Sequence, residues 1–204
     1  MAQIDTPHLE CLKVDYLDEH DGFEFQIPQL CKFINRTEIF KQHQFRSADL
    51  CFEDYTVTLE LDEGWMFRIS ILEEWISEIL GQNFDMFSNV DRLYIFARFA
   101  GVGPEDIVLG EGTRWLELLR LFTAVQALSV EDTLSHHVVL ALNGSTGESA
   151  AEVLPALELL CLENEEVTRV QDFVAFRRNM GRPLTFINSP TEFEKRLGLN
   201  ISDS

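Results

Sequence analysis

The sequence predicts an α/β fold: a short, irregular solenoid with parallel strands on one face and helices on the other. The first observation behind this prediction is a repeated pattern, apolar-x-x-apolar-x-apolar, centred on Leu93, Leu128 and Leu160 at intervals of 35 and 32 residues. The second is that segments with the apolar spacing of helices lie between these repeats. Because each unit has an apolar strand face that it cannot bury alone, successive units are expected to stack.

Strands are predicted at every copy of the repeated pattern. Three clear copies span residues 90–95, 125–130 and 157–162, and four weaker copies span 9–14, 50–52, 67–71 and 184–186. Strands that alternate with helices at this period are expected to be parallel and joined by crossover helices. The sequence therefore predicts a leucine-rich-repeat-like architecture.

Helices are predicted between the strands. Apolar residues recur every three or four positions over residues 72–80, 113–122, 135–142 with 148–154, and 167–180. Thr113 is the expected N-cap of the second of these segments. The last segment ends at Gly181, with Arg177 and Arg178 in its final turn, where the helix dipole favours positive charge.

Residues 55–72 depart from the repeat. Apolar and polar residues alternate over 55–61 and again over 65–71, and Asp62-Glu-Gly64 between them can form a turn. This pattern predicts a hairpin near residues 55–72, so the sheet is expected to be mixed there.

Length and composition predict one domain over residues 1–204, with repeats over 6–188 and a C-terminal cap and tail over 189–204. A hydrophobic fraction of 46% and 16 Phe are sufficient for a sizeable core. The four cysteines, Cys11, Cys31, Cys51 and Cys161, are dispersed and lack metal-ligand spacing. They are expected to be buried or half-buried reduced thiols, as in an intracellular compartment.

The charge limits the expected partners. With 35 acidic and 16 basic residues, the formal net charge is −19, which repels phosphate backbones, so nucleic acid is not expected. The same charge fits either simple solubility or a preference for a basic protein partner. The apolar runs are far shorter than the roughly 20 residues that span a bilayer, and the N-terminus does not resemble a secretory signal. We therefore expect no membrane association and a cytoplasmic or nuclear location.

Four stretches carry a resemblance to a known family. The first runs from residues 4–9 through to residues 27–37, and the others are 115–125, 152–160 and 181–183. They resemble the repeat-containing C-terminal region of F-box/leucine-rich-repeat-like proteins from basidiomycete fungi. The resemblance implies that the repeats hold a target protein while an F-box docks on a ubiquitin-ligase adaptor. No stretch of this chain resembles the F-box itself, so the resemblance bears on the binding role more than on ligase membership.

No residue pattern predicts a catalytic, cofactor or metal site. His136 and His137 would point about 100° apart on a helix, and no third ligand lies at a suitable spacing. The glycine-bearing loops at 101–106 and 109–113 lack the Lys-Ser/Thr of a phosphate-binding loop and carry acidic residues instead. The Asn-x-Ser pattern at 143–145 is interpreted as part of a turn. We therefore expect no cofactor.

Strand alternation predicts the binding surface. If Leu93, Leu128 and Leu160 point into the core, their neighbours along each strand line the opposite face. A row that mixes aromatic, small and acidic side chains suits protein recognition. The competing interpretation is that further chain covers this face. The candidate partner-binding face comprises Asp49, Cys51, Glu53, Arg68, Ser70, Arg92, Tyr94, Phe96, Ser129, Glu131, Leu159, Cys161 and Glu163.

Three hypotheses for the function follow from these patterns. The leading one is a non-catalytic protein-recognition module, in its specific form a substrate receptor for a ubiquitin ligase. The second is a structural or self-assembling α/β protein, in which a sheet edge pairs between copies. The third is an enzyme, because an α/β fold by itself does not exclude catalysis.

Overall fold

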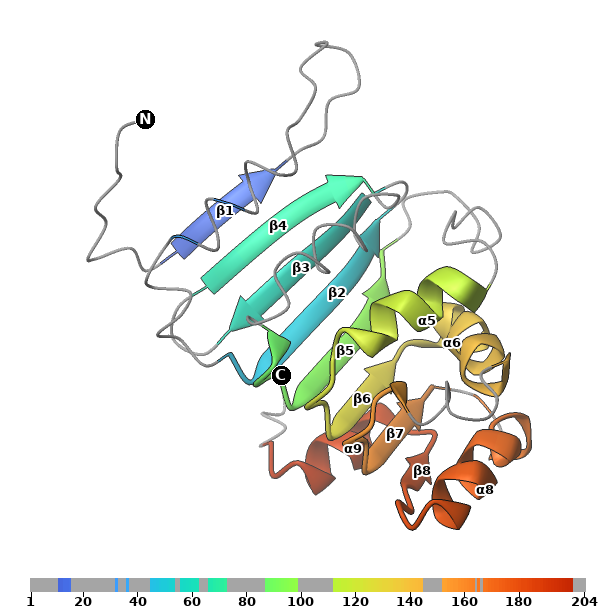
Figure 1. The fold of residues 1–204 in the computed structure, drawn as a ribbon. Coiled ribbons are helices and arrows are strands. Elements are labelled where there is room, and N and C mark those ends of the chain that lie inside the picture. Colours follow the sequence, from blue (N-terminus) through green and yellow to red (C-terminus); the bar gives the residue numbers. More distant parts are fainter. Residues whose placement is uncertain are drawn as a thin grey trace.

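The fold is built on one twisted sheet of eight strands in the order β1-β4-β3-β2-β5-β6-β7-β8 (Figure 1). The structure is a computed structural model that describes residues 11–15, 32, 36, 45–53, 56–62, 66–72, 87–98, 112–144, 152–163, 165 and 167–199. Five of the seven strand pairings are parallel and two are antiparallel. The chain is therefore an α/β protein with a mostly parallel sheet.

The strands occur where the sequence predicts them. Each of the seven predicted copies of the repeat overlaps one strand, and β3 arises from the first half of the predicted hairpin. The bounds are β1 Cys11–Asp15, β2 Ser47–Glu53, β3 Thr56–Asp62, β4 Met66–Leu72, β5 Arg92–Ala97, β6 Ala127–Val130, β7 Leu159–Leu162 and β8 Thr185–Ile187.

The register of the parallel strands agrees with the repeat. Leu93 on β5 pairs with Leu128 on β6, and Leu128 pairs with Leu160 on β7. All three side chains are completely buried. The prediction that these leucines lie on adjacent parallel strands and share one interior is therefore confirmed.

The N-terminal half of the sheet has a different topology. Strands β3 and β4 form the predicted antiparallel hairpin, with Val57 opposite Ile71. Strand β2 is also antiparallel to β3, so β2, β3 and β4 form a meander. Strand β1 lies parallel to β4 at the outer edge, and β5 is added to the other side of β2. Only β5 to β8 follow the predicted order of consecutive parallel strands.

The described helices α5, α6 and α8 lie between strands of the C-terminal half, and α9 follows the last strand. The predicted segments 113–122 and 135–142 are helical, but the segment 167–180 is split into a 3-10 turn and a helix. Leu72, where the first predicted helix begins, belongs to strand β4, and the rest of that segment and most of 148–154 lie outside the described residues. The bounds are α5 Gly112–Arg120, α6 Asp132–Gly144, η3 Val167–Arg169, α8 Gln171–Asn179 and α9 Pro190–Arg196.

The main core lies between one face of the sheet and the helices α5, α6 and α8. Trp115 on α5 packs its indole against Phe52 on β2, with ring centroids 5.3 Å apart. Phe173 contributes the apolar side of α8 to the same core. Buried apolar surface of this kind is the dominant stabilising contribution to a fold. The core therefore covers one face of the sheet, and the opposite face of the sheet does not contact α5, α6 or α8.

Arg177 in the last turn of α8 is buried, although the sequence places it there only as a partner for the helix dipole. Its guanidinium donates hydrogen bonds to the carbonyl of Pro155 at 3.2 and 3.3 Å and to the carbonyl of Leu157 at 2.7 Å. These carbonyls precede β7, so Arg177 ties α8 to the start of that strand. Gly181, with φ of 71°, follows the helix in the left-handed conformation that glycine favours.

Candidate binding face and cleft

The face of the sheet opposite the core carries the predicted surface residues. Asp49 on β2 pairs with Tyr94 on β5, Tyr94 with Ser129 on β6, and Ser129 with Cys161 on β7. A second row joins Cys51 to Phe96. The structure thus brings residues from four strands into rows, although Asp49 and Cys161, at the two ends of the first row, are more than a hundred positions apart in the chain.

Strands β3 and β4 extend both rows toward the N-terminal edge. Glu60 on β3 lies in register between Asp49 and Arg68, and Thr58 lies between Cys51 and Ser70. For Arg68 and Ser70 only the backbone position is described. Thr58 and Glu60 were not among the predicted face residues, although the polar alternation of the predicted hairpin was the signal that could have identified them.

One end of this face is not available to a partner, because helix α9 covers it. Phe193 of α9 packs with Ala127, Cys161 and Ile187 in a small second core, and Leu159 lies at its edge. Cys161 is completely buried and Cys51 is only 5% exposed. The expectation that the thiols are buried or half-buried is confirmed, and their assignment to an exposed row is corrected: α9 covers Cys161, and Cys51 is buried within the row on β2. Leu159 is half-buried beside Phe193.

The part of the face that remains open lies over β2, β3 and β5. Asp49, Thr58, Glu60 and Phe96 are all half-buried there. Ion pairs at the margin link Arg98 to Glu53 at 3.7 Å and Arg92 to Asp91 at 3.4 Å. The open region therefore combines polar and aromatic side chains on a rigid sheet, without a helix above them among the described residues.

A cleft of about 160 Å³ lies where the open region meets α9. It is formed at the carboxyl ends of the parallel strands β5, β6 and β7, which is the edge where α/β sheets commonly bind ligands. Ten of the described residues line it: Tyr94, Ile95, Phe96, Ser129, Val130, Glu131, Glu163, Pro190, Phe193 and Glu194.

Two glutamates of the cleft occupy equivalent positions after their strands. Glu131 directly follows β6 and its backbone N–H donates to the carbonyl of Ile95 at 2.9 Å. Glu163 directly follows β7 and its N–H donates to the carbonyl of Val130 at 3.0 Å. The side chain of Glu131 is also held in place, because its Oε2 accepts a 2.7 Å hydrogen bond from the N–H of Ala97. Both carboxylates were part of the predicted face.

The groups on this face that could act as nucleophiles are held in their protonated forms. Burial, together with the Glu53 carboxylate, raises the pKa of the Cys51 thiol to about 12. Burial also raises the pKa of Cys161 and that of Tyr94. Because the thiolate is the reactive form of cysteine, these thiols are poor nucleophiles at neutral pH.

The other features that drew attention in the sequence form no site within the described part of the chain. His137 stacks on Trp115 at 6.4 Å, and His136 meets His137 edge-on at 6.0 Å. In the described ranges no group of three His, Cys, Asp or Glu side chains is arranged to hold a metal ion. Of the helices described, none has the length and apolar character needed to cross a membrane. The glycine-bearing loop at 101–106 and most of that at 109–113 lie outside the described residues.

The chain was compared with protein-family models, with curated proteins and with solved structures, and none of the three comparisons found a match. The geometry of the face and the cleft is therefore the basis for a functional assignment.

Proposed function

We propose that this chain is a non-catalytic protein-recognition module that binds a protein partner through the open region of the sheet over β2, β3 and β5. The observation that carries this proposal is the arrangement of the half-buried Asp49, Thr58, Glu60 and Phe96 on a part of the sheet face that no described helix covers. A flat row of polar and aromatic side chains on rigid strands is typical of protein interfaces. Rigid strands also lower the entropy that is lost on binding.

The rest of the face agrees with a binding role better than with catalysis. The two thiols of this face, Cys51 and Cys161, are buried and have raised pKa values. At about 160 Å³ the cleft is smaller than the roughly 300–1,000 Å³ of typical small-molecule sites. Both cysteines are unpaired, which supports the expectation of a reducing cytoplasmic or nuclear compartment.

The resemblance noted in the sequence gives the proposal a specific form, a substrate receptor for a ubiquitin ligase. In this form the α/β units of β5 to β8 are the remnant of a leucine-rich-repeat-like solenoid, and the sheet face holds the target. Support comes from four consecutive parallel strands in chain order whose connecting helices α5, α6 and α8 pack on one core. The ligase-receptor version of the proposal is tested separately, by asking whether a ligase adaptor co-purifies with the longest natural version of the protein.

The general proposal is tested by affinity capture with matched variants. The double variant Asp49→Lys/Thr58→Lys places two long cations on the open region. Glu117→Lys/Asn179→Lys makes the same change in net charge on exposed positions of α5 and α8, away from this face. We expect the wild-type chain and the control to retain the same partner, and the face variant to lose it.

Thermal melting of all three proteins shows whether each variant is folded. Light scattering on the wild-type chain distinguishes partner binding from self-assembly, because a second copy of the chain as the only captured protein would favour the structural hypothesis. Equal retention by both variants, or equal loss, would contradict the proposal that the open region is the binding surface.

A further inference from the structure

The cleft beside α9 has the dimensions of a site for one side chain. Its volume is about 160 Å³, and its walls come from the ends of β5, β6 and β7 on one side and from α9 on the other. A water molecule occupies roughly 30 Å³ in the liquid, so the cleft can exchange a few waters for a long side chain. It lies next to the open region, within reach of a partner bound there.

The charges that the described residues contribute to the cleft are all negative. Glu131, Glu163 and Glu194 are half-buried in its lining, and the described lining residues include no Lys, Arg or His. Ion pairs of described residues do not involve these three glutamates: they join Asp91, Glu53, Glu165 and Glu192 to arginines. Three carboxylates gathered in one cleft produce a negative potential that favours a positively charged occupant.

The cleft also has aromatic walls. Tyr94, Phe96 and Phe193 contribute rings to the lining. The chain itself shows how a cation fits at this margin, because the Arg98 guanidinium lies 5.4 Å from the centre of the Phe96 ring and 3.7 Å from Glu53. Aromatic rings and carboxylates together recognise guanidinium and ammonium groups through cation–π attraction and charge-assisted hydrogen bonds.

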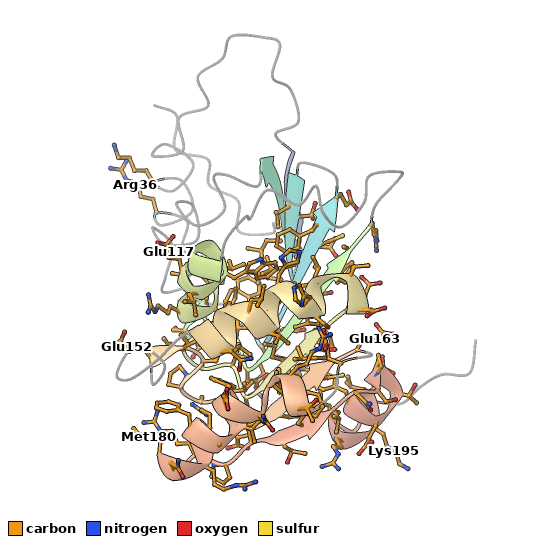
Figure 2. All side chains as sticks on the ribbon, turned by 90° about the vertical axis from the view of Figure 1, so that its right-hand side faces the viewer. Arg36, Glu117, Glu152, Glu163, Met180 and Lys195 are labelled. Atoms are coloured by element: carbon orange, nitrogen blue, oxygen red, sulfur yellow. The ribbon has the colours of Figure 1, made fainter. Side chains whose placement is uncertain are left out.

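We infer that the cleft receives an arginine or lysine side chain from a basic segment of the protein partner, which Glu163 and Glu194 bind beside the rings of Tyr94 and Phe193. This inference rests on the proposed function, because it assigns the chemistry of the partner at that same face. The overall charge of −19 acts in the same direction by attracting basic segments from a distance. Figure 2 shows Glu163 on the side of the molecule that carries Lys195 of α9, away from Glu117 and Glu152.

The test uses three short peptides as probes: acetyl-Gly-Arg-Gly-amide, the same peptide with lysine, and the same peptide with citrulline. Citrulline has nearly the shape of arginine but no charge. We expect the arginine and lysine peptides to shift the backbone amide resonances of Ser129, Glu163 and Glu194 in a saturable way. We expect the citrulline peptide to bind at least about tenfold more weakly, equivalent to ~1.4 kcal/mol.

Two double variants with the same net charge localise the binding. Glu163→Gln/Glu194→Gln removes the two cleft carboxylates other than Glu131, whose side chain accepts the hydrogen bond from Ala97. Glu117→Gln/Glu152→Gln removes two exposed carboxylates elsewhere. We expect the first to weaken the arginine peptide about tenfold and the second less than about twofold. The hydrogen bond from Ala97 to Glu131 is preserved in both variants, so both are expected to remain folded, which thermal melting verifies.

Equal weakening in both variants would overturn the inference, because it would indicate binding to the overall charge alone. Equal affinity for the citrulline peptide would overturn it as well. Loss of the natural partner by Asp49→Lys/Thr58→Lys, combined with no peptide binding in the cleft, would contradict the cleft inference and leave the proposed function standing. Peptide binding in the cleft, without any captured partner at the open region, would support the charge chemistry of the cleft and contradict the proposed function.

Discussion

The ring of Phe193 on α9 meets the ring of Tyr94 on β5 edge-on, with centroids 5.8 Å apart and planes inclined by 86°. This geometry is one of the two that aromatic pairs favour. The contact holds the C-terminal helix against the sheet face and forms one wall of the cleft. A residue near the C-terminus is thus in contact with a strand in the middle of the chain.

The first prediction concerns this contact. Phe193→Ala removes a side chain that is 1% exposed, so we expect the free energy of unfolding to fall by about 3–5 kcal/mol. We also expect faster reaction of Cys161 with a thiol reagent, because α9 would no longer cover it. Urea unfolding and thiol labelling measure the two effects. Leu199→Ala, at an exposed position, should change the free energy of unfolding by no more than ~0.5 kcal/mol.

The second prediction concerns the hydrogen bond between Glu131 and the Ala97 N–H. Glu131→Ala leaves this donor without its partner, so we expect a loss of about 1–3 kcal/mol in the free energy of unfolding. Glu131→Gln keeps an acceptor oxygen and should recover most of that loss. Urea unfolding of the two variants makes the comparison. Equal destabilisation by Ala and Gln would show that the charge of Glu131, and not the hydrogen bond, stabilises the fold.

The third prediction concerns pH. The pKa of Cys51 is about 12 in the folded chain and 9.0 in the usual reference state, so the unfolded chain loses this proton first. Between these two values the folded chain binds more protons than the unfolded chain, and its stability must fall as the pH rises. We expect the free energy of unfolding to decrease more steeply above pH 9 in the wild type than in Cys51→Ala.

Urea unfolding at pH 8, 9 and 10 provides this measurement. The contributions of Cys161 and Tyr94, whose pKa values are also raised, cancel in the difference between the two proteins. The cavity left by the Ala substitution adds a constant offset that does not vary with pH. Parallel pH profiles would show that the Cys51 thiol ionises as readily in the folded chain as in the unfolded one.

The fourth prediction concerns Arg177. Its guanidinium bonds to the carbonyls of Pro155 and Leu157 from a buried position. Hydrogen bonds that involve a charged group contribute about 1.5–3 kcal/mol each, so Arg177→Ala should lower the free energy of unfolding by at least ~2 kcal/mol. The neighbouring, exposed Arg178→Ala provides the control and should be nearly neutral. A similar effect of the two substitutions would contradict the assigned role.

The strands could be predicted because strand periodicity is a local property of the sequence. The spacing of Leu93, Leu128 and Leu160 also predicted the register, since equivalent apolar positions must share the core. The alternation over 55–71 predicted the hairpin for the same reason. In each case the hydrophobic pattern alone specifies which side chain faces inward.

The order of the strands could not be predicted in the same way. The residue pattern of β2 does not indicate whether its parallel neighbour is β5 or β1. The neighbour depends on the tertiary arrangement of β2, β3 and β4, which leaves β2 beside β5 and β4 beside β1. The position of α9 was missed for a related reason: a helix of seven residues with Phe193 as its buried residue has too little periodicity to show which surface it covers. The cleft depends on that position, so its lining from Pro190 to Glu194 was missed as well.

The burial of Arg177 illustrates a different limit. From a sequence pattern, an arginine is predicted to be exposed to solvent, or to interact with the negative C-terminal end of a helix dipole. The structure buries it because the carbonyls of Pro155 and Leu157 supply acceptors at the right place. Such compensation depends on tertiary contacts, which a single sequence does not display.

The topology of the sheet also sets an order of events as the chain leaves the ribosome. Strands β5 to β8 lie side by side in the order of synthesis, so each can dock on its predecessor as soon as it emerges. Strand β2 can pair with β5 only after the residues from Arg92 onward have been synthesised. Strand β1 can pair with β4 only after the residues from Met66 onward have been synthesised. During synthesis the N-terminal strands therefore have unpaired edges until these partners emerge, and such edges can pair with other chains.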